Sequence, residues 1–132
     1  MDVLAPPPPR AVVQSVEDAM QLIRSGDTIA TSGFVGCGTP DALLAGLAAR
    51  YEATGEPAGL SLVFAAGQGD GVNRGLNRLA SPGLLRRVVG GHWGLIPKVA
   101  ALAIENQVEG WNLPQGVISR LYRDVAAGLP GT

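Results

Sequence analysis

Four short strand-like segments, each followed by a turn that contains glycine or proline, constrain this sequence most. They lie at residues 27–31, 60–66, 85–89 and 108–113, and stretches with helical spacing separate them. Residues 60–66 form a nearly continuous apolar run, which is typical of a parallel strand that is covered on both faces. Strands that alternate with helices indicate an α/β fold. We therefore expect an open, mainly parallel sheet flanked by helices.

The stretches between these strands carry recognisable helix signals. Ser15 is placed to cap a helix that should end at Gly26, and Thr39 to cap one that starts with Pro40 and ends at Gly55. Further helical stretches are expected near 76–80, 96–107 and 117–127. Because parallel strands end at a common edge, the four turns should lie together where ligands of such sheets bind.

Length and composition limit the class of protein. The chain has 132 residues, of which 46% are hydrophobic and 16% charged, so we expect one packed domain or part of one. Residues 1–13, with prolines at 6–9, read as a flexible leader, and 14–132 as the folded part.

Charge and sequence pattern also argue against several functions and locations. A formal charge of -1 gives no basis for nucleic-acid binding, and a single cysteine permits no internal disulfide. No metal site is expected. The sequence has neither a secretory signal pattern nor an uninterrupted apolar run of membrane-spanning length, so no membrane association and a cytoplasmic location are expected.

The loop after the first strand resembles a segment of a known enzyme family. Residues 32–40, Ser-Gly-Phe-Val-Gly-Cys-Gly-Thr-Pro, are similar to the Gly-Gly-Phe-x-x-x-Gly-x-Pro segment of family I coenzyme A transferases, with Ser32 in place of the first glycine. Residues 65–71, 84–95 and 112–116 resemble later stretches of that family, in the same order. The match is to the amino-terminal part of the acetate or propionate CoA-transferase branch.

The resemblance implies an enzyme that moves CoA between short-chain carboxylic acids. In that family a glutamate attacks the acyl-CoA and forms a glutamyl-CoA thioester, from which an incoming carboxylate collects the CoA. That glutamate belongs to the second half of the polypeptide, in a Glu-x-Gly-like segment. This sequence has no glutamate in such a segment. We therefore expect no catalytic residue here, an incomplete domain, and partners that are the rest of the enzyme and further copies of it.

Substrate-binding residues follow from the same resemblance. Gly33, Phe34 and Gly38 should shape the acyl pocket, since glycine backbone can bring N–H groups close to a developing oxyanion. Gln115 matches a family glutamine that reaches the active-site carboxylates. Coenzyme A would be a substrate, and no separate cofactor is expected. Two alternatives stay open: the glycine loops are turn chemistry alone, or they serve a non-catalytic CoA or nucleotide binding module.

Several other residues invite a chemical role but favour a structural one. Cys37 is expected to be a packed thiol and His92 a packing residue, while Asp70 should cap its own turn. Arg86 and Arg87 are adjacent in a strand, so they should point to opposite faces and at most one could meet the phosphates of CoA. A solvated or salt-bridged pair is the simpler expectation.

Overall fold

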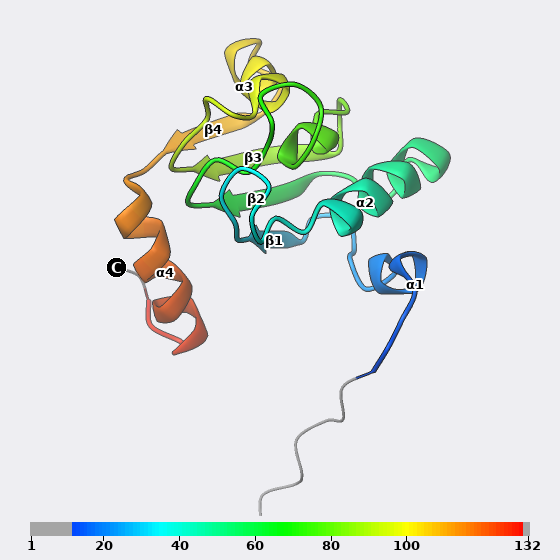
Figure 1. Ribbon diagram of the computed structural model, residues 1–132, viewed down its shortest axis with the longest axis horizontal. Helices are drawn as coiled ribbons and strands as arrows, with labels where there is room; N and C mark the ends of the chain where they lie inside the picture. Colours follow the sequence, from blue (N-terminus) through cyan, green and yellow to red (C-terminus); the bar gives the residue numbers. More distant parts are fainter. Residues whose placement is uncertain (1–11, 131–132) are drawn as a thin grey trace, which may run out of the picture.

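The four predicted strands form one parallel sheet. The computed structural model describes residues 12–130, so most of the expected leader lies outside the described residues. The strands are β1 (Thr28–Thr31), β2 (Leu60–Phe64), β3 (Leu85–Gly90) and β4 (Glu109–Asn112). Their order in the sheet is β1-β2-β3-β4, and each neighbouring pair is parallel (Figure 1). The predicted α/β class with a mainly parallel sheet is confirmed.

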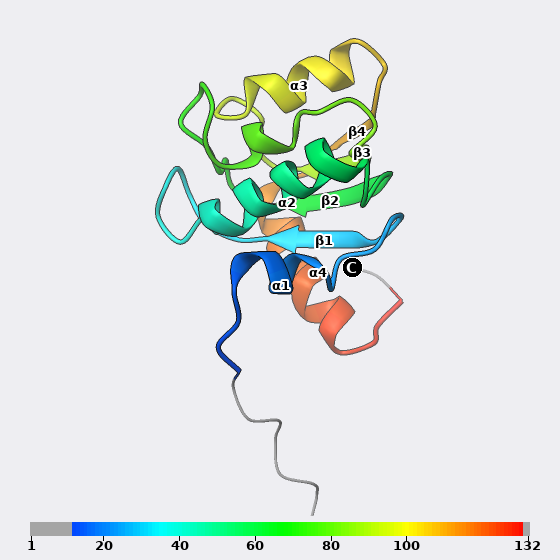
Figure 2. The same cartoon turned by 90° about the vertical axis from the view of Figure 1, so that its right-hand side faces the viewer.

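The main core lies on one face of this sheet. The helices are α1 (Val16–Met20), α2 (Asp41–Thr54), the 3-10 helix η1 (Leu76–Leu79), α3 (Pro97–Ile104) and α4 (Gln115–Ala126). Apolar residues of α2, η1 and α3 pack with Leu62, Phe64 and Val88, whose side chains are fully buried. Figure 2 shows α2 in front of the strands and α4 beyond them. Only one face of the sheet is therefore covered by the main core.

Helix α1 begins as predicted but ends early. The Ser15 hydroxyl accepts a hydrogen bond from the Asp18 amide at 3.0 Å, which confirms the cap. The helix ends at Met20, not at Gly26, because the amides of residues 21–23 bond to carbonyls three residues back and the backbone after them bonds elsewhere. The Arg24 amide donates to the Asp27 carboxylate, and the Gly26 amide donates to the Ala58 carbonyl. The spacing of the apolar residues did not predict these competing hydrogen bonds.

Helix α2 ends where predicted but is not capped as predicted. Pro40 stands at the N-cap position, and no side chain there accepts a hydrogen bond. The Thr39 hydroxyl instead donates to the Val35 carbonyl at 3.0 Å, so it holds the preceding turn rather than the helix. Gly55 closes the helix with a φ of 74°, a conformation that glycine adopts at low cost.

An irregularity in β3 corrects the expectation for the two arginines. Leu60 pairs with Leu85 and Ser61 pairs with Arg87, so Arg86 has no partner position in β2. This bulge removes the strict alternation, and both arginines are exposed. Arg87 forms the expected salt bridge, with Glu109 on β4 at 2.6 Å.

Candidate active site

The turns that follow the strands meet at the carboxyl edge of the sheet. The Val35 amide donates to the Gly67 carbonyl at 2.8 Å, which joins the turn after β1 to the turn after β2. The Gly91 amide donates to Phe64 at the end of β2, and the Leu113 amide donates to Gly90 at the end of β3. The predicted gathering of the four turns is thus present.

A cavity of about 300 Å³ opens at this edge, between the turns and helix α4. We call it the carboxyl-edge cavity. It is lined by Thr31, Ser32, Gly33, Ala65, Ala66, Gln68, Ser119 and Tyr122. Its walls therefore come from β1, from the turns after β1 and β2, and from the first two turns of α4.

Gly33 has a steric reason to be glycine. Its φ is 129°, and an added Cβ would lie only 2.6 Å from the Thr39 hydroxyl. The chain then makes a tight turn in which the amides and carbonyls of Phe34 and Cys37 bond to each other at 2.8 and 2.9 Å. Gly38 leaves this turn with a φ of 68°. The loop is built around its glycines and stands at the rim of the cavity.

The side chains of this loop point outward. Phe34 is 60% exposed and Val35 40% exposed. Val35 also adopts a φ of 54°, which is costly for a β-branched residue. Cys37 is exposed as well, so the expectation of a packed thiol is wrong: the tight turn carries it away from the core. The loop thus presents an aromatic and an aliphatic side chain to solvent.

Gln115 lies at the same edge as Gly33. It is the first residue of α4, and its Cγ would be 2.7 Å from a Cβ added to Gly91. The Ser119 hydroxyl, which lines the cavity, donates to the Gln115 carbonyl at 2.9 Å. Gln115 itself is exposed and stands one helical turn before the cavity wall. The structure thus brings Gly33 and the start of α4 to one region.

Tyr122 and Gln68 are cavity residues that sequence reasoning missed. The Tyr122 hydroxyl donates to the carbonyls of Thr31 and Val63, each at 3.1 Å, and burial raises the pKa of the phenol. Gln68 is fully buried, and its amide donates to the same Thr31 carbonyl at 3.1 Å. Gln115, Ser119 and Tyr122 follow i, i+4, i+7 spacing, so the helical period placed them on one side of α4.

Two carboxylates near this edge accept hydrogen bonds from other groups of the chain. Asp70 accepts hydrogen bonds from the backbone amides of Val72, Asn73 and Arg74, as expected of a turn cap, and these lower the pKa of its carboxyl to about 2. Asp41 is paired with Arg78 through two hydrogen bonds of 2.8 and 2.9 Å. Both carboxylates are thus engaged by groups of the chain itself.

A larger groove lies elsewhere on the molecule. It has a volume of about 480 Å³ and runs between α2, η1 and the start of α3, over a floor of alanines. Its lining residues come mainly from helices, whereas the carboxyl-edge cavity is built from the turns that follow parallel strands. We therefore place the site at the carboxyl edge. His92 is exposed rather than packed in the core, and its ring lies against Gly67.

Comparison with known proteins shows which family the chain belongs to. The profile of the family described as Coenzyme A transferase matches residues 13–132. The chain belongs to the coenzyme A transferase family. The acetate CoA-transferase YdiF of Escherichia coli K12 is 36% identical over 124 residues, which are 92% of this chain and 23% of that protein. The E. coli acetate CoA-transferase subunit alpha is 30% identical over 119 residues, which are 90% of this chain and 51% of that subunit.

Solved structures of this transferase family share the fold. The apoenzyme of the acyl-CoA transferase YdiF from E. coli O157:H7 superposes with a TM-score of 0.84 at 34% identity, covering 95% of this chain and 25% of that one. A thioester complex of the same protein with CoA gives a TM-score of 0.82. The chain thus spans about a quarter of the length of these transferases.

Among residues 12–130, no helix is long and apolar enough to cross a membrane.

Proposed function

We propose that this chain is part of a short-chain acyl-CoA:carboxylate CoA-transferase whose attacking glutamate is supplied by polypeptide outside residues 1–132. The observation that carries this proposal is the composition of the carboxyl-edge cavity. All five glutamates of the sequence lie in the described part of the chain, and none of them lines the cavity. The cavity offers backbone, hydroxyl and amide groups, which suit binding and orientation but cannot provide a carboxylate nucleophile.

Each proposed site residue has a role that fits its position. Gly33 and Gly38 let the loop backbone approach the acyl group without a side chain in between. Phe34 provides an apolar surface at the rim, where it would contact the acyl chain. Gln115, at the start of α4, would hydrogen-bond the catalytic carboxylate or the incoming acid. The substrates would be an acyl-CoA and a short-chain carboxylate, and the complete enzyme would be a homo-oligomer.

Transfer of CoA between two acids tests the proposal. The chain alone, and a chimera in which it replaces the matching segment of E. coli YdiF, are incubated with acetyl-CoA and propionate, and propionyl-CoA is measured. We expect turnover by the chimera only. Turnover by the 132-residue chain alone would show that the nucleophile lies within it and would refute the proposal.

A pair of glutamine variants in the chimera tests the role of Gln115. Gln115→Ala should lower kcat by about 10- to 100-fold if this amide orients the reacting carboxylate. Gln107→Ala is the matched control, because Gln107 is an exposed glutamine whose amide bonds Glu105 on the turn after α3. Equal activity of the two variants would contradict the role of Gln115.

A non-catalytic CoA or nucleotide binding module is the second candidate. It is favoured by the lining of the cavity, which offers hydroxyl and amide groups for binding but no carboxylate. Calorimetric titration of the chain with CoA separates the two, because a binding module should bind CoA tightly without further polypeptide. Our proposal predicts weak or undetectable binding by the chain alone.

A further inference from the structure

The carboxyl-edge cavity is small, and one of its walls is bulky. Its volume of about 300 Å³ is at the lower end of the range for small-molecule sites. Six of its eight lining residues are glycine, alanine, serine or threonine, whose side chains take up little space. The two larger lining side chains are those of Gln68, which is fully buried, and Tyr122, which is half-buried on α4. Tyr122 is therefore the lining residue with the largest side chain.

Hydrogen bonds to the sheet fix the tip of the Tyr122 ring. The phenol hydroxyl lies 3.1 Å from the carbonyls of Thr31 and Val63, which share its proton near the ends of β1 and β2. The Thr31 carbonyl also accepts a hydrogen bond from the Gln68 amide at 3.1 Å. One carbonyl at the end of β1 thus holds both of the large lining side chains. The ring cannot swing out of the cavity without breaking its hydrogen bond to the sheet.

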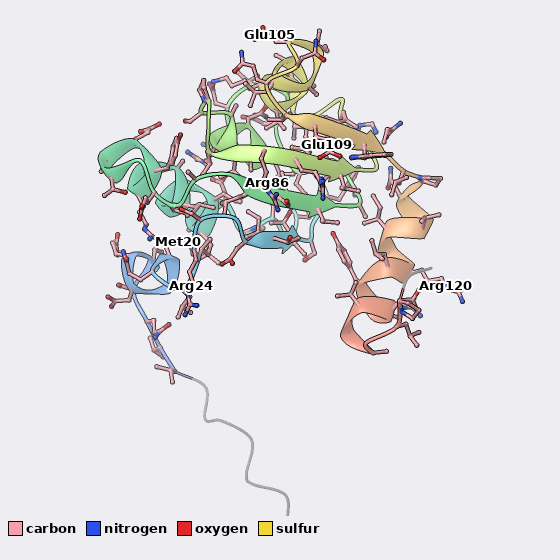
Figure 3. All side chains as sticks on the ribbon, turned by 180° about the vertical axis from the view of Figure 1, so that it is seen from behind. Met20, Arg24, Arg86, Glu105, Glu109 and Arg120 are labelled. Atoms are coloured by element: carbon pink, nitrogen blue, oxygen red, sulfur yellow. The ribbon has the colours of Figure 1, made fainter. Side chains whose placement is uncertain are left out.

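The base of the ring is fixed as well, because α4 is anchored to the sheet. Ile118 is fully buried and lies one helical turn before Tyr122, so both residues are on the side of α4 that faces the sheet. Figure 3 shows α4 beside the strands, with Arg120 on the side of the helix that points away from them. The Arg120 side chain is accordingly 74% exposed. Tyr122 is thus held at both ends, and its ring forms a rigid wall.

We propose that the Tyr122 ring sets the upper limit on the length of the acyl chain that the enzyme transfers. This inference rests on the proposed function, in which the loop at Gly33 holds the acyl group of an acyl-CoA at this cavity. The carbons of a short acid fit among the small lining residues, whereas a longer chain would need the space that the ring fills. Forcing extra methylenes against a rigid wall is unfavourable. Tyr122 is thus a specificity-determining residue that takes no part in the chemistry.

Competition between two acids tests the inference. The chimera of this chain with E. coli YdiF is given acetyl-CoA with equal concentrations of propionate and hexanoate. Each acid takes CoA from acetyl-CoA and releases acetate, and the initial amounts of propionyl-CoA and hexanoyl-CoA are measured by mass spectrometry. The ratio of the two products equals the ratio of the two kcat/KM values. It does not depend on the fraction of folded enzyme, because both acids compete for the same molecules.

Variants of Tyr122 should change this ratio according to the space that they free. Tyr122→Ala removes the ring, whose volume exceeds that of the three additional methylenes of hexanoate. Burial of each methylene is worth about fourfold, so the ratio of hexanoyl-CoA to propionyl-CoA should rise by about 60-fold. Tyr122→Leu frees the space of about one methylene and should raise the ratio about fourfold, and it replaces Tyr122→Ala if that variant does not fold. Tyr122→Phe keeps the ring, so its ratio should match that of the unmodified chimera.

Tyr51→Ala is the matched control, because Tyr51 is the other tyrosine of the sequence and does not line the cavity. Its hydroxyl donates to the Pro82 carbonyl at 2.8 Å, so this variant also loses a ring and a hydrogen bond. Its product ratio should stay within about twofold of that of the unmodified chimera, which is less than the effect of one buried methylene.

Three results would overturn the inference. One is a ratio in Tyr122→Ala, or in Tyr122→Leu where alanine does not fold, within about twofold of the unmodified chimera. Another is an equal rise in Tyr51→Ala, which would make a general loosening of the fold the cause. The third is an equal rise in Tyr122→Phe, which would make the hydroxyl and not the ring the cause. A folded chimera that forms neither product refutes the proposed function and this inference with it, whereas transfer with an unchanged ratio refutes the inference alone.

Discussion

Substitution of Gly90 by alanine should destabilise the protein through one identifiable clash. Gly90 pairs with Phe64 across the sheet, and an added Cβ would lie within 3.0 Å of three carbons of the Phe64 ring. The ring is fully buried and packs edge-on against Trp93, with 5.8 Å between ring centroids. It therefore has little space into which to retreat. Overpacking of this kind costs about 2–3 kcal/mol of unfolding free energy.

Equilibrium unfolding in urea, followed by circular dichroism and by tryptophan fluorescence, measures this cost. Gly116→Ala is the matched control, because Gly116 lies in α4 with no atom within 4 Å of an added Cβ. That variant should be stabilised by about 0.5–1 kcal/mol through helix propensity. A Gly90→Ala protein within about 0.5 kcal/mol of the wild type would refute the packing argument, because overpacking of a rigid core costs more than this.

Three further predictions concern polar contacts. The hydrogen bonds from Arg78 and the Gly75 amide lower the pKa of Asp41 from 3.8 to about 2, so the unfolded state binds its proton more readily. This stabilisation should be present above about pH 4 and lost between about pH 4 and 2, and urea midpoints of Asp41→Asn should lack that loss. Tyr122→Phe should cost about 1–2 kcal/mol and speed hydrogen exchange in α4, since the hydroxyl proton that two carbonyls of the sheet share is removed. Asn77→Ala should cost about 2–4 kcal/mol in urea unfolding, because its buried amide makes three hydrogen bonds to backbone groups; a loss below about 1 kcal/mol would contradict this.

The strands and their turns were predictable because their signals are local. An apolar run that ends in glycine indicates a strand and its turn without reference to distant residues. All four strands appear within a few residues of their expected bounds. The end of α1 was not predictable, because the backbone of Gly26 bonds to Ala58, which is distant in sequence. Thr39 was misassigned for a related reason: its hydroxyl donates to the Val35 carbonyl in the turn before it and accepts no hydrogen bond from the amides of α2.

The candidate site was predictable in part. Its loops could be found from their glycines, and the resemblance pointed to Gln115. Tyr122 was missed because its hydroxyl reaches β1 and β2 only after the chain has turned back along α4. The outward position of both Arg86 and Arg87 depends on a β-bulge, and neither residue is a sequence signal for a bulge.

The strand order has a consequence for how the protein is made. Each of β2, β3 and β4 pairs with the strand synthesised just before it, so a chain leaving the ribosome can add each new strand to those already made. Among the strands of residues 12–130, neighbours in the sheet are also neighbours in the sequence, which keeps the sequence separation of sheet contacts short.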